Sequence, residues 1–207
     1  GRDFDTAVRY GNWESRNTLR GSELFGKNLL LVGFGRIGRE VGKRALAFGM
    51  QLHVYDPYVD EQQVGAAGAV YVKDLDTFLP KTDFLSLHLP YTPKNHHIIG
   101  HEELRALPSS AYVINTARGG LIDEDELFKA LESGNLAGAG LDCFEQEPPS
   151  NNLKLLNSGR VIVSPHNASL TAECTRRLGL VCVENVVDAL TGCLKKERVV
   201  NWDAVHA

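Results

Sequence analysis

Short apolar runs alternate with helix-like stretches along most of this chain, and this alternation constrains its fold more than any other feature. The runs expected to form strands cover residues 28–32, 51–55, 83–87, 111–115, 138–141 and 160–163. The stretches with helical spacing cover residues 36–48, 74–79, 102–107, 124–133 and 172–190. Apolar strands that alternate with helices are typical of parallel sheets. We therefore predict an α/β fold, a doubly wound parallel sheet of about six strands with helices on both faces.

A glycine-rich turn with the sequence GFGRIG follows the first predicted strand and opens the first predicted helix. Gly33 suits a tight turn, Gly35 lets a ligand approach the backbone, and Gly38 lets the helix pack close to the strand. The N–H groups at a helix N-terminus, here those of Arg36 and Ile37, attract phosphate groups. This arrangement is typical of Rossmann-type domains, in which the turn holds the pyrophosphate of a dinucleotide.

An acidic residue, Asp56, follows the next predicted strand. In dinucleotide-binding domains a carboxylate at this position accepts hydrogen bonds from the adenosine ribose and repels the extra phosphate of NADP. Because strand, turn, helix and acid coincide, we predict that the cofactor is NAD. The alternative is a plain βαβ turn beside a solvated aspartate.

The composition is that of a globular chain, because 43% of its 207 residues are hydrophobic and 23% are charged, with a net charge of −4. Its Lys and Arg residues are scattered, so we predict no nucleic-acid partner. The apolar runs are too short to span a bilayer and the first residues lack a signal-peptide pattern, so we expect a cytoplasmic protein without a membrane partner. The 4 cysteines lack CxxC spacing and the 7 histidines form no ligand motif. We expect buried free thiols and no metal site.

Three polar segments follow later predicted strands, where open α/β sheets bind their ligands. They contain Arg118, Glu147 and His166. A guanidinium binds a carboxylate in a bidentate way, an imidazole transfers a proton, and a neighbouring carboxylate raises the pKa of that imidazole. Reduction of a 2-keto acid to a 2-hydroxy acid needs these three groups. Taken singly, each has a structural alternative: a surface ion pair for Arg118, a capping or core role for His166, and a loop charge for Glu147.

Several longer segments carry a resemblance that covers roughly residues 10–200. In sequence order, these segments are GSELFGKNLLLVGFGRIG (21–38), AFGMQLHVYDPY (47–58), SLHLPYTPKNHHII (86–99), INTARGGLIDEDEL (114–127), GLDCFEQEPP (140–149) and SPHNAS (164–169). The chain resembles the D-isomer-specific 2-hydroxyacid dehydrogenase family. The resemblance implies an NAD-dependent oxidoreductase that is similar to phosphoglycerate dehydrogenase or to hydroxypyruvate and glyoxylate reductases, with the individual substrate left open.

The resemblance also implies roles for the polar residues. It implies that Arg118 binds the substrate and that Glu147 pairs with His166, the general acid or base. One departure is Cys143, which stands where the family commonly has Val and which we interpret as a core residue.

Further residues are expected to line the cofactor site. The resemblance implies that Asp142 holds the nicotinamide amide and that Pro90 and the backbone of Thr116 and Ala117 line the nicotinamide side, while His88 shapes the pocket. Together with the glycine-rich turn, the residues expected to contact the cofactor are Gly33, Gly35, Arg36, Ile37, Gly38, Asp56, His88, Pro90, Thr116, Ala117, Arg118, Asp142 and His166.

We expect residues 1–20 to form a polar, irregular leader, residues 21–192 the NAD-binding domain, and residues 193–207 a segment that leads back to a substrate-binding domain. Family members are usually longer, so we expect most of that second domain to lie outside this chain. Without that domain as a second wall, the substrate cleft cannot exclude water, and we expect NAD binding with little or no turnover.

The resemblance implies a homodimer through the cofactor domain. The alternative function is an NAD(H)-sensing corepressor or binding module.

Overall fold

The computed structural model describes residues 2–205, which form two compact units, one that ends at Val163 and one that begins at Ser164. The first unit contains the whole sheet. Its strands are β1 (Asn28–Val32), β2 (Gln51–Tyr55), β3 (Val70–Tyr71), β4 (Phe84–Leu87), β5 (Tyr112–Asn115), β6 (Gly138–Leu141) and β7 (Val161–Val163).

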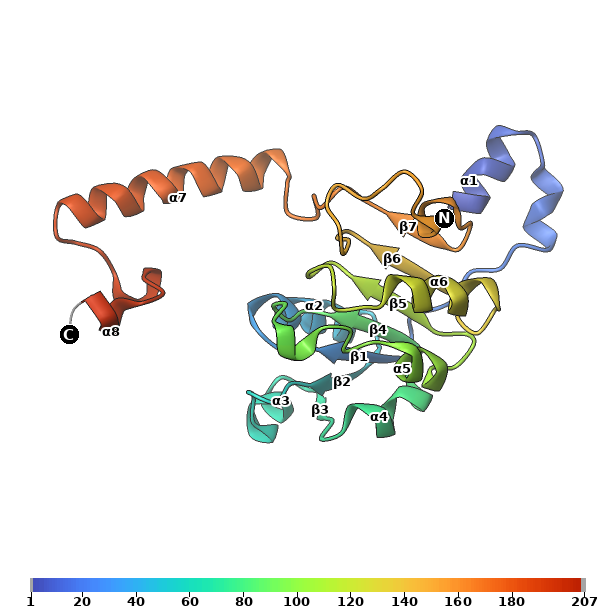
Figure 1. Ribbon diagram of the computed structural model, residues 1–207, viewed down its shortest axis with the longest axis horizontal. Helices are drawn as coiled ribbons and strands as arrows, with labels where there is room; N and C mark the ends of the chain where they lie inside the picture. The colour runs from blue at the N-terminus through green and yellow to red at the C-terminus, as the bar shows by residue number, and fades with distance from the viewer. Residues whose placement is uncertain (1, 206–207) are drawn as a thin grey trace. The chain divides into compact units, whose positions relative to one another are not determined.

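The seven strands lie in the order β3-β2-β1-β4-β5-β6-β7 (Figure 1). All neighbouring strands are parallel. The direction of winding reverses between β1 and β4, and in sheets of this kind ligands bind outside the carboxyl ends of the strands at that reversal. The predicted Rossmann-type, doubly wound fold is confirmed.

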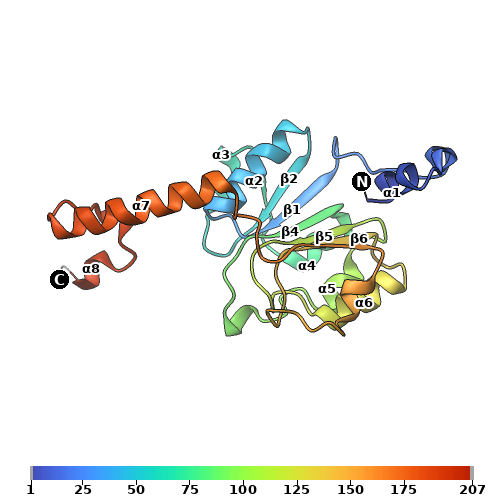
Figure 2. The ribbon, with the colours of Figure 1, turned by 90° about the horizontal axis from the view of Figure 1, so that it is seen from above.

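Helices of the first unit cover both faces of this sheet. The helices of the described residues are α1 (Arg2–Arg9), α2 (Arg36–Ala47), α3 (Glu61–Ala66), α4 (Leu75–Phe78), α5 (His101–Ala106), α6 (Glu124–Glu132), α7 (Ala172–Leu190) and α8 (Trp202–Val205), of which the last two belong to the second unit. Figure 2 shows α2 and α3 on one face of the sheet and α4, α5 and α6 on the other. Asp123 caps α6 by accepting a hydrogen bond from the backbone N–H of Glu126.

The sheet separates two apolar cores, and the side chains of β1 alternate between them. Leu30 and Val32 belong to the larger core under α4, α5 and α6, while Leu29 and Leu31 belong to the core under α2 and α3. Leu30 and Leu31 are both 0% exposed. Full burial of one such side chain stabilises the fold by about 2 kcal/mol. A strand that is buried on both faces has a continuous apolar sequence, and this explains why β1 was predictable.

Some expectations about secondary structure are wrong. The prediction lacks β3 and α3, because β3 has only two residues and α3 buries only Val64. The leader is not irregular, since it forms α1 and a 3₁₀ helix at Trp13–Asn17. Three strands begin one residue later than expected, at Phe84, Tyr112 and Val161.

The cysteines are free thiols, and their burial differs from the expectation. Cys143 is buried, as predicted, but Cys182 and Cys193 are exposed and Cys174 is half-buried. These three lie in the second unit, where α7 has no buried residue among those that the structure describes. The expectation of buried thiols is therefore wrong for α7 and the segment after it, because no core forms around them within that unit.

Candidate cofactor and active site

The glycine-rich turn connects β1 to α2 and packs tightly against the end of β4. Gly33 has φ of +99°, and a Cβ atom there would lie 2.6 Å from the carbonyl oxygen of His88. A Cβ atom on Gly38 would overlap the carbonyl oxygen of Gly33. Around Gly35, by contrast, a Cβ atom would meet nothing within 4 Å. The turn is thus closed on its inner side and open at Gly35, where a ligand can approach the backbone.

Asp56 lies at the end of β2, directly beside this turn. Its carboxylate accepts hydrogen bonds from the backbone N–H of Phe34 at 2.7 Å and of Tyr58 at 2.9 Å. A carboxylate offers about four lone-pair sites, so these two bonds orient it and leave acceptor capacity for a ribose hydroxyl. The open backbone at Gly35, the N-terminus of α2 and the fixed carboxylate of Asp56 therefore fit a dinucleotide.

His88 follows β4 and forms part of the wall against which the turn packs. Its Nε2 lies 2.9 Å from the hydroxyl of Ser86, and its backbone N–H donates to the carbonyl of Val32. Burial lowers the pKa of His88 to about 4. The imidazole is therefore neutral near pH 7 and adds no charge to the cofactor side of the sheet.

The loop after β5 carries Arg118 and is shaped by Asn115, a buried residue at the end of that strand. The side chain of Asn115 donates to the carbonyl of Arg118 at 2.8 Å and accepts from the N–H of Ala117 at 3.0 Å. The guanidinium of Arg118 donates to the carbonyl of Ala117. The sequence analysis did not identify Asn115 as a positioning residue, although Asn is favoured where a side chain closes a turn.

The loop after β6 carries Asp142 and Glu147. Asp142 is 3% exposed, and its backbone N–H donates to the carbonyl of Asn115. Glu147 accepts a hydrogen bond from the backbone N–H of Phe144 at 3.1 Å. A Cβ atom on Gly119 would overlap the carbonyl of Phe144, so the loops after β5 and β6 touch through their backbones. The sheet thereby brings the predicted residues Arg118, Asp142 and Glu147 to one edge.

The remaining predicted residues divide between the units. Pro90 lies in the first unit, and its carbonyl accepts from the side chain of Asn95 at 2.8 Å. His166 lies in the second unit and has φ of +50°, which is uncommon for a residue other than glycine. Its pairing with Glu147 stays a prediction.

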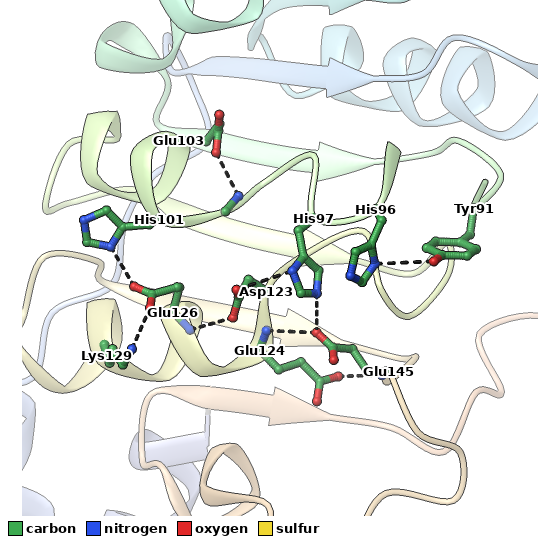
Figure 3. A network of polar contacts seen from close by, with 11 residues as sticks. Tyr91, His96, His97, His101, Glu103, Asp123, Glu124, Glu126, Lys129 and Glu145 are labelled. Carbon is green, nitrogen blue, oxygen red and sulfur yellow. Dashed lines mark hydrogen bonds and ion pairs between the residues drawn. The ribbon is translucent and has the colours of Figure 1, made fainter. Parts of the chain in front are cut away.

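A polar network that the sequence analysis missed connects the loops after β4, β5 and β6 (Figure 3). His97 lies between two carboxylates, with Nε2 at 2.9 Å from Glu145 and Nδ1 at 3.4 Å from Asp123. The backbone N–H of Glu145 donates to the carboxylate of Glu124 at 2.7 Å. Burial raises the pKa of Glu124. No sequence motif marks this network, because its members are brought together only by the fold.

Two further features are absent from the described residues. Among residues 2–205, no group of three or more His, Cys, Asp or Glu side chains is arranged to hold a metal ion. No helix in that part of the chain combines the length and the apolar character needed to cross a membrane.

Comparison with known proteins finds a family model and curated relatives that match most of this chain. Residues 2–168 match the family model for the NAD binding domain of D-isomer specific 2-hydroxyacid dehydrogenases. The chain is 42% identical over 195 residues to a D-3-phosphoglycerate dehydrogenase of Methanocaldococcus jannaschii, covering 94% of this chain and 37% of that protein. It is 44% identical over 186 residues to a hydroxypyruvate reductase of Thermotoga maritima, covering 89% of this chain and 59% of that protein.

Solved structures agree with these relatives. The fold is similar to that of D-lactate dehydrogenase from Aquifex aeolicus complexed with NAD and lactic acid, with a TM-score of 0.83 and 33% identity over 92% of this chain and 61% of that one. The chain thus spans from 37% to 61% of the length of these three relatives. It belongs to the D-isomer specific 2-hydroxyacid dehydrogenase family and carries the NAD-binding domain of that family.

Proposed function

We propose that this protein interconverts a 2-keto acid and a D-2-hydroxy acid with NAD as the cofactor. The observation that carries the proposal is the meeting of the Arg118 loop and the Asp142–Glu147 loop at the carboxyl edge of the sheet that also bears the glycine-rich turn. Relatives named D-3-phosphoglycerate dehydrogenase, hydroxypyruvate reductase and glyoxylate reductase support small 2-keto and 2-hydroxy acids as the substrate class.

Each residue has a role in this proposal. When bound, NAD accepts or supplies the hydride. Arg118 binds the substrate carboxylate, because the guanidinium matches its geometry and polarises the adjacent carbonyl. His166 gives a proton to the carbonyl oxygen during reduction and removes it from the hydroxyl during oxidation. Glu147 pairs with His166 and fixes its tautomer, while Asp142 holds the nicotinamide amide.

In the first unit, the proposed cofactor site follows the carboxyl ends of the strands from β2 to β6. Its members there are Gly33, Gly35, Arg36, Ile37, Gly38, Asp56, His88, Pro90, Thr116, Ala117, Arg118 and Asp142. We propose His166 of the second unit as a further contact of the cofactor. The space at Gly35 and the fixed orientation of Asp56 support this assignment. A neutral His88 also supports it, since this imidazole does not add a positive charge beside the positively charged ring of NAD⁺.

The test is an assay of NADH oxidation with hydroxypyruvate and glyoxylate, and of NAD reduction with D-3-phosphoglycerate, in the longest natural chain that contains this sequence. We expect turnover with at least one substrate. Arg118→Ala and His166→Ala should lower turnover by roughly 10² to 10⁴-fold and leave NADH affinity nearly unchanged. NADH binding without turnover of any 2-keto acid would favour the corepressor or binding module. Active variants would overturn the assigned roles.

We further propose that the protein is a homodimer through the cofactor domain. The leader that precedes this domain extends the expected interface, because large apolar side chains in it are exposed: Val8 by 58%, Trp13 by 60% and Tyr10 by 84%. Exposed apolar surface of this kind is typical of protein interfaces. Sedimentation analysis of the protein and of Trp13→Asp tests this, since we expect a dimer that the substitution weakens. A monomeric parent protein would contradict it.

The domain limits are also proposals: a leader over residues 1–20, the NAD-binding domain over 21–192, and a segment at 193–207 that leads to the substrate-binding domain. Limited proteolysis tests them, because we expect cleavage near these limits before cleavage inside the sheet.

We propose a cytoplasmic location, which the free state of the 4 cysteines supports. Imaging of a tagged protein tests that location.

A further inference from the structure

We propose that His97 is a positioning residue for this reaction, which rests on the function proposed above. His97, Asp123 and Glu145 form what we call the His97 clamp. The clamp holds the loop after β5, which carries Arg118, against the loop after β6, which carries Glu147. His97 acts through Asp123 and Glu145.

The backbone around His97 already joins the loop after β4 to the loop after β5. The N–H of His97 donates to the carbonyl of Gly120 at 2.8 Å, and the N–H of Ile99 donates to the carbonyl of Leu121 at 3.1 Å. The N–H of Asp123 returns a hydrogen bond to the carbonyl of Ile99 at 3.0 Å. His97 has φ of +51°, a left-handed conformation that persists where surrounding bonds fix it. The position of the imidazole is therefore set by the main chain.

The imidazole then joins two elements that are distant in the sequence (Figure 3). On one side lies Asp123, whose other oxygen caps α6 by accepting from the N–H of Glu126 at 3.0 Å. On the other side lies Glu145, whose Oε1 is 2.9 Å from Nε2. The side chains of His97 and Asp123 are 29% and 28% exposed, so water screens this contact only in part. The clamp thus reaches from the start of α6 to the loop after β6.

Hydrogen bonds of neighbouring backbone groups connect Glu145 to Glu147. The N–H of Glu145 donates to Glu124 Oε1 at 2.7 Å, and the N–H of Glu124 donates to Glu145 Oε1 at 3.3 Å. One residue earlier, the N–H of Phe144 donates to Glu147 Oε1 at 3.1 Å. A shift of Glu145 therefore moves the backbone that orients the Glu147 carboxylate.

The clamp uses both ring nitrogens of His97. Nε2 faces Glu145 and Nδ1 faces Asp123. The other groups that face His97 are Glu124 and Asp125 along the same surface hollow, and His96, whose ring stacks on it at 3.7 Å. Loss of the imidazole therefore removes the contacts to two loops at once.

The first test compares His97→Gln with His101→Gln in the longest natural chain. His101 is a matched control, because it also bonds a glutamate, Glu126 at 2.7 Å, but lies at the start of α5. We expect His97→Gln to lower kcat/KM about tenfold and to change NADH affinity by less than about twofold. His101→Gln should behave as the parent. An unchanged kcat/KM in His97→Gln, a parallel loss of NADH affinity, or an equal loss in His101→Gln would overturn the proposal.

The second test does not depend on activity. Amide hydrogen exchange of residues 116–124 and 143–147 is measured without substrate in the parent, in His97→Gln and in His101→Gln. We expect faster exchange in both segments only in His97→Gln. Unchanged exchange overturns the clamp whatever the activity, whereas faster exchange in a protein that turns over no 2-keto acid supports the clamp and rejects the proposed function. If His97→Gln does not fold, Glu145→Gln removes the same contact from the other side.

Discussion

Gly119 lies so close to Phe144 that the carbonyl of Phe144 occupies the space a side chain on Gly119 would need. The obstacle is backbone, which cannot turn aside as a flexible side chain can. This contact fixes the distance between the loop that carries Arg118 and the loop that carries Glu147.

We predict that Gly119→Ala lowers the free energy of unfolding by about 1–3 kcal/mol and reduces turnover, because the two loops must separate. Gly159→Ala is the control, since a Cβ atom there meets nothing within 4 Å, and it should change stability by less than about 0.5 kcal/mol. Urea unfolding monitored by fluorescence gives both values. Equal stabilities for the two variants would contradict the close contact.

Replacement of Asp56 should change cofactor preference. Asp56→Ser removes the charge that repels the extra phosphate of NADPH, and it weakens the bonds that orient the turn at Phe34 and Tyr58. We expect the ratio of NADPH to NADH affinity to rise about tenfold, as measured by fluorescence titration. Asp60→Asn keeps the cap of α3 and should leave the ratio unchanged. If Asp56→Ser retains the parent ratio, the carboxylate does not select the cofactor.

His88 should make stability depend on pH in a defined window. Burial lowers its pKa to about 4 from the ordinary value of 6.5, so between these values the unfolded chain binds a proton that the folded chain does not. The free energy of unfolding should therefore fall as pH decreases from 6.5 toward 4, with roughly 3 kcal/mol as the upper limit of the effect. His88→Gln should flatten this slope, and His101→Gln should keep it. Urea unfolding at several pH values measures it, and identical slopes in all three proteins would contradict the burial effect.

The cysteines should differ sharply in reactivity. Burial, together with the charges of Glu147 and Asp142, raises the pKa of Cys143 to about 12. Thiolates are the reactive species, so iodoacetamide near neutral pH should modify exposed Cys182 and Cys193 and spare Cys143. Peptide mass spectrometry measures the modification, and Cys143 should react once urea unfolds the chain. Rapid modification of Cys143 in the folded protein would disprove its burial.

Local sequence was sufficient to predict the elements that bury a continuous apolar stretch. The limits of β1 and β2 match the structure, since β1 lies between Lys27 and Gly33 and β2 ends before Asp56. The strand β3 was not predictable, since two residues show no periodicity and Val70 is 59% exposed. Its place in the sheet comes from pairing with β2, a tertiary effect that no short window of sequence contains.

Some parts of the candidate site were likewise predictable from the sequence, and others were not. The turn from Gly33 to Gly38 was predictable because its function depends on residue types at fixed spacing. The His97 clamp was not, since its three residues come from three loops and each alone resembles an ordinary solvated charge. Asn115 lies between these cases, because its position at the end of a strand indicates a turn but not which residue the turn positions.

The main-chain bonds between the loops after β4 and β5 have an evolutionary consequence. The hydrogen bonds from His97 to Gly120 and from Ile99 to Leu121 use backbone atoms alone. Such bonds survive replacement of most side chains, so selection can alter exposed residues such as Tyr91 without dismantling the frame that carries Arg118. The frame therefore tolerates single side-chain substitutions around the proposed site, with no insertion or deletion required in these loops.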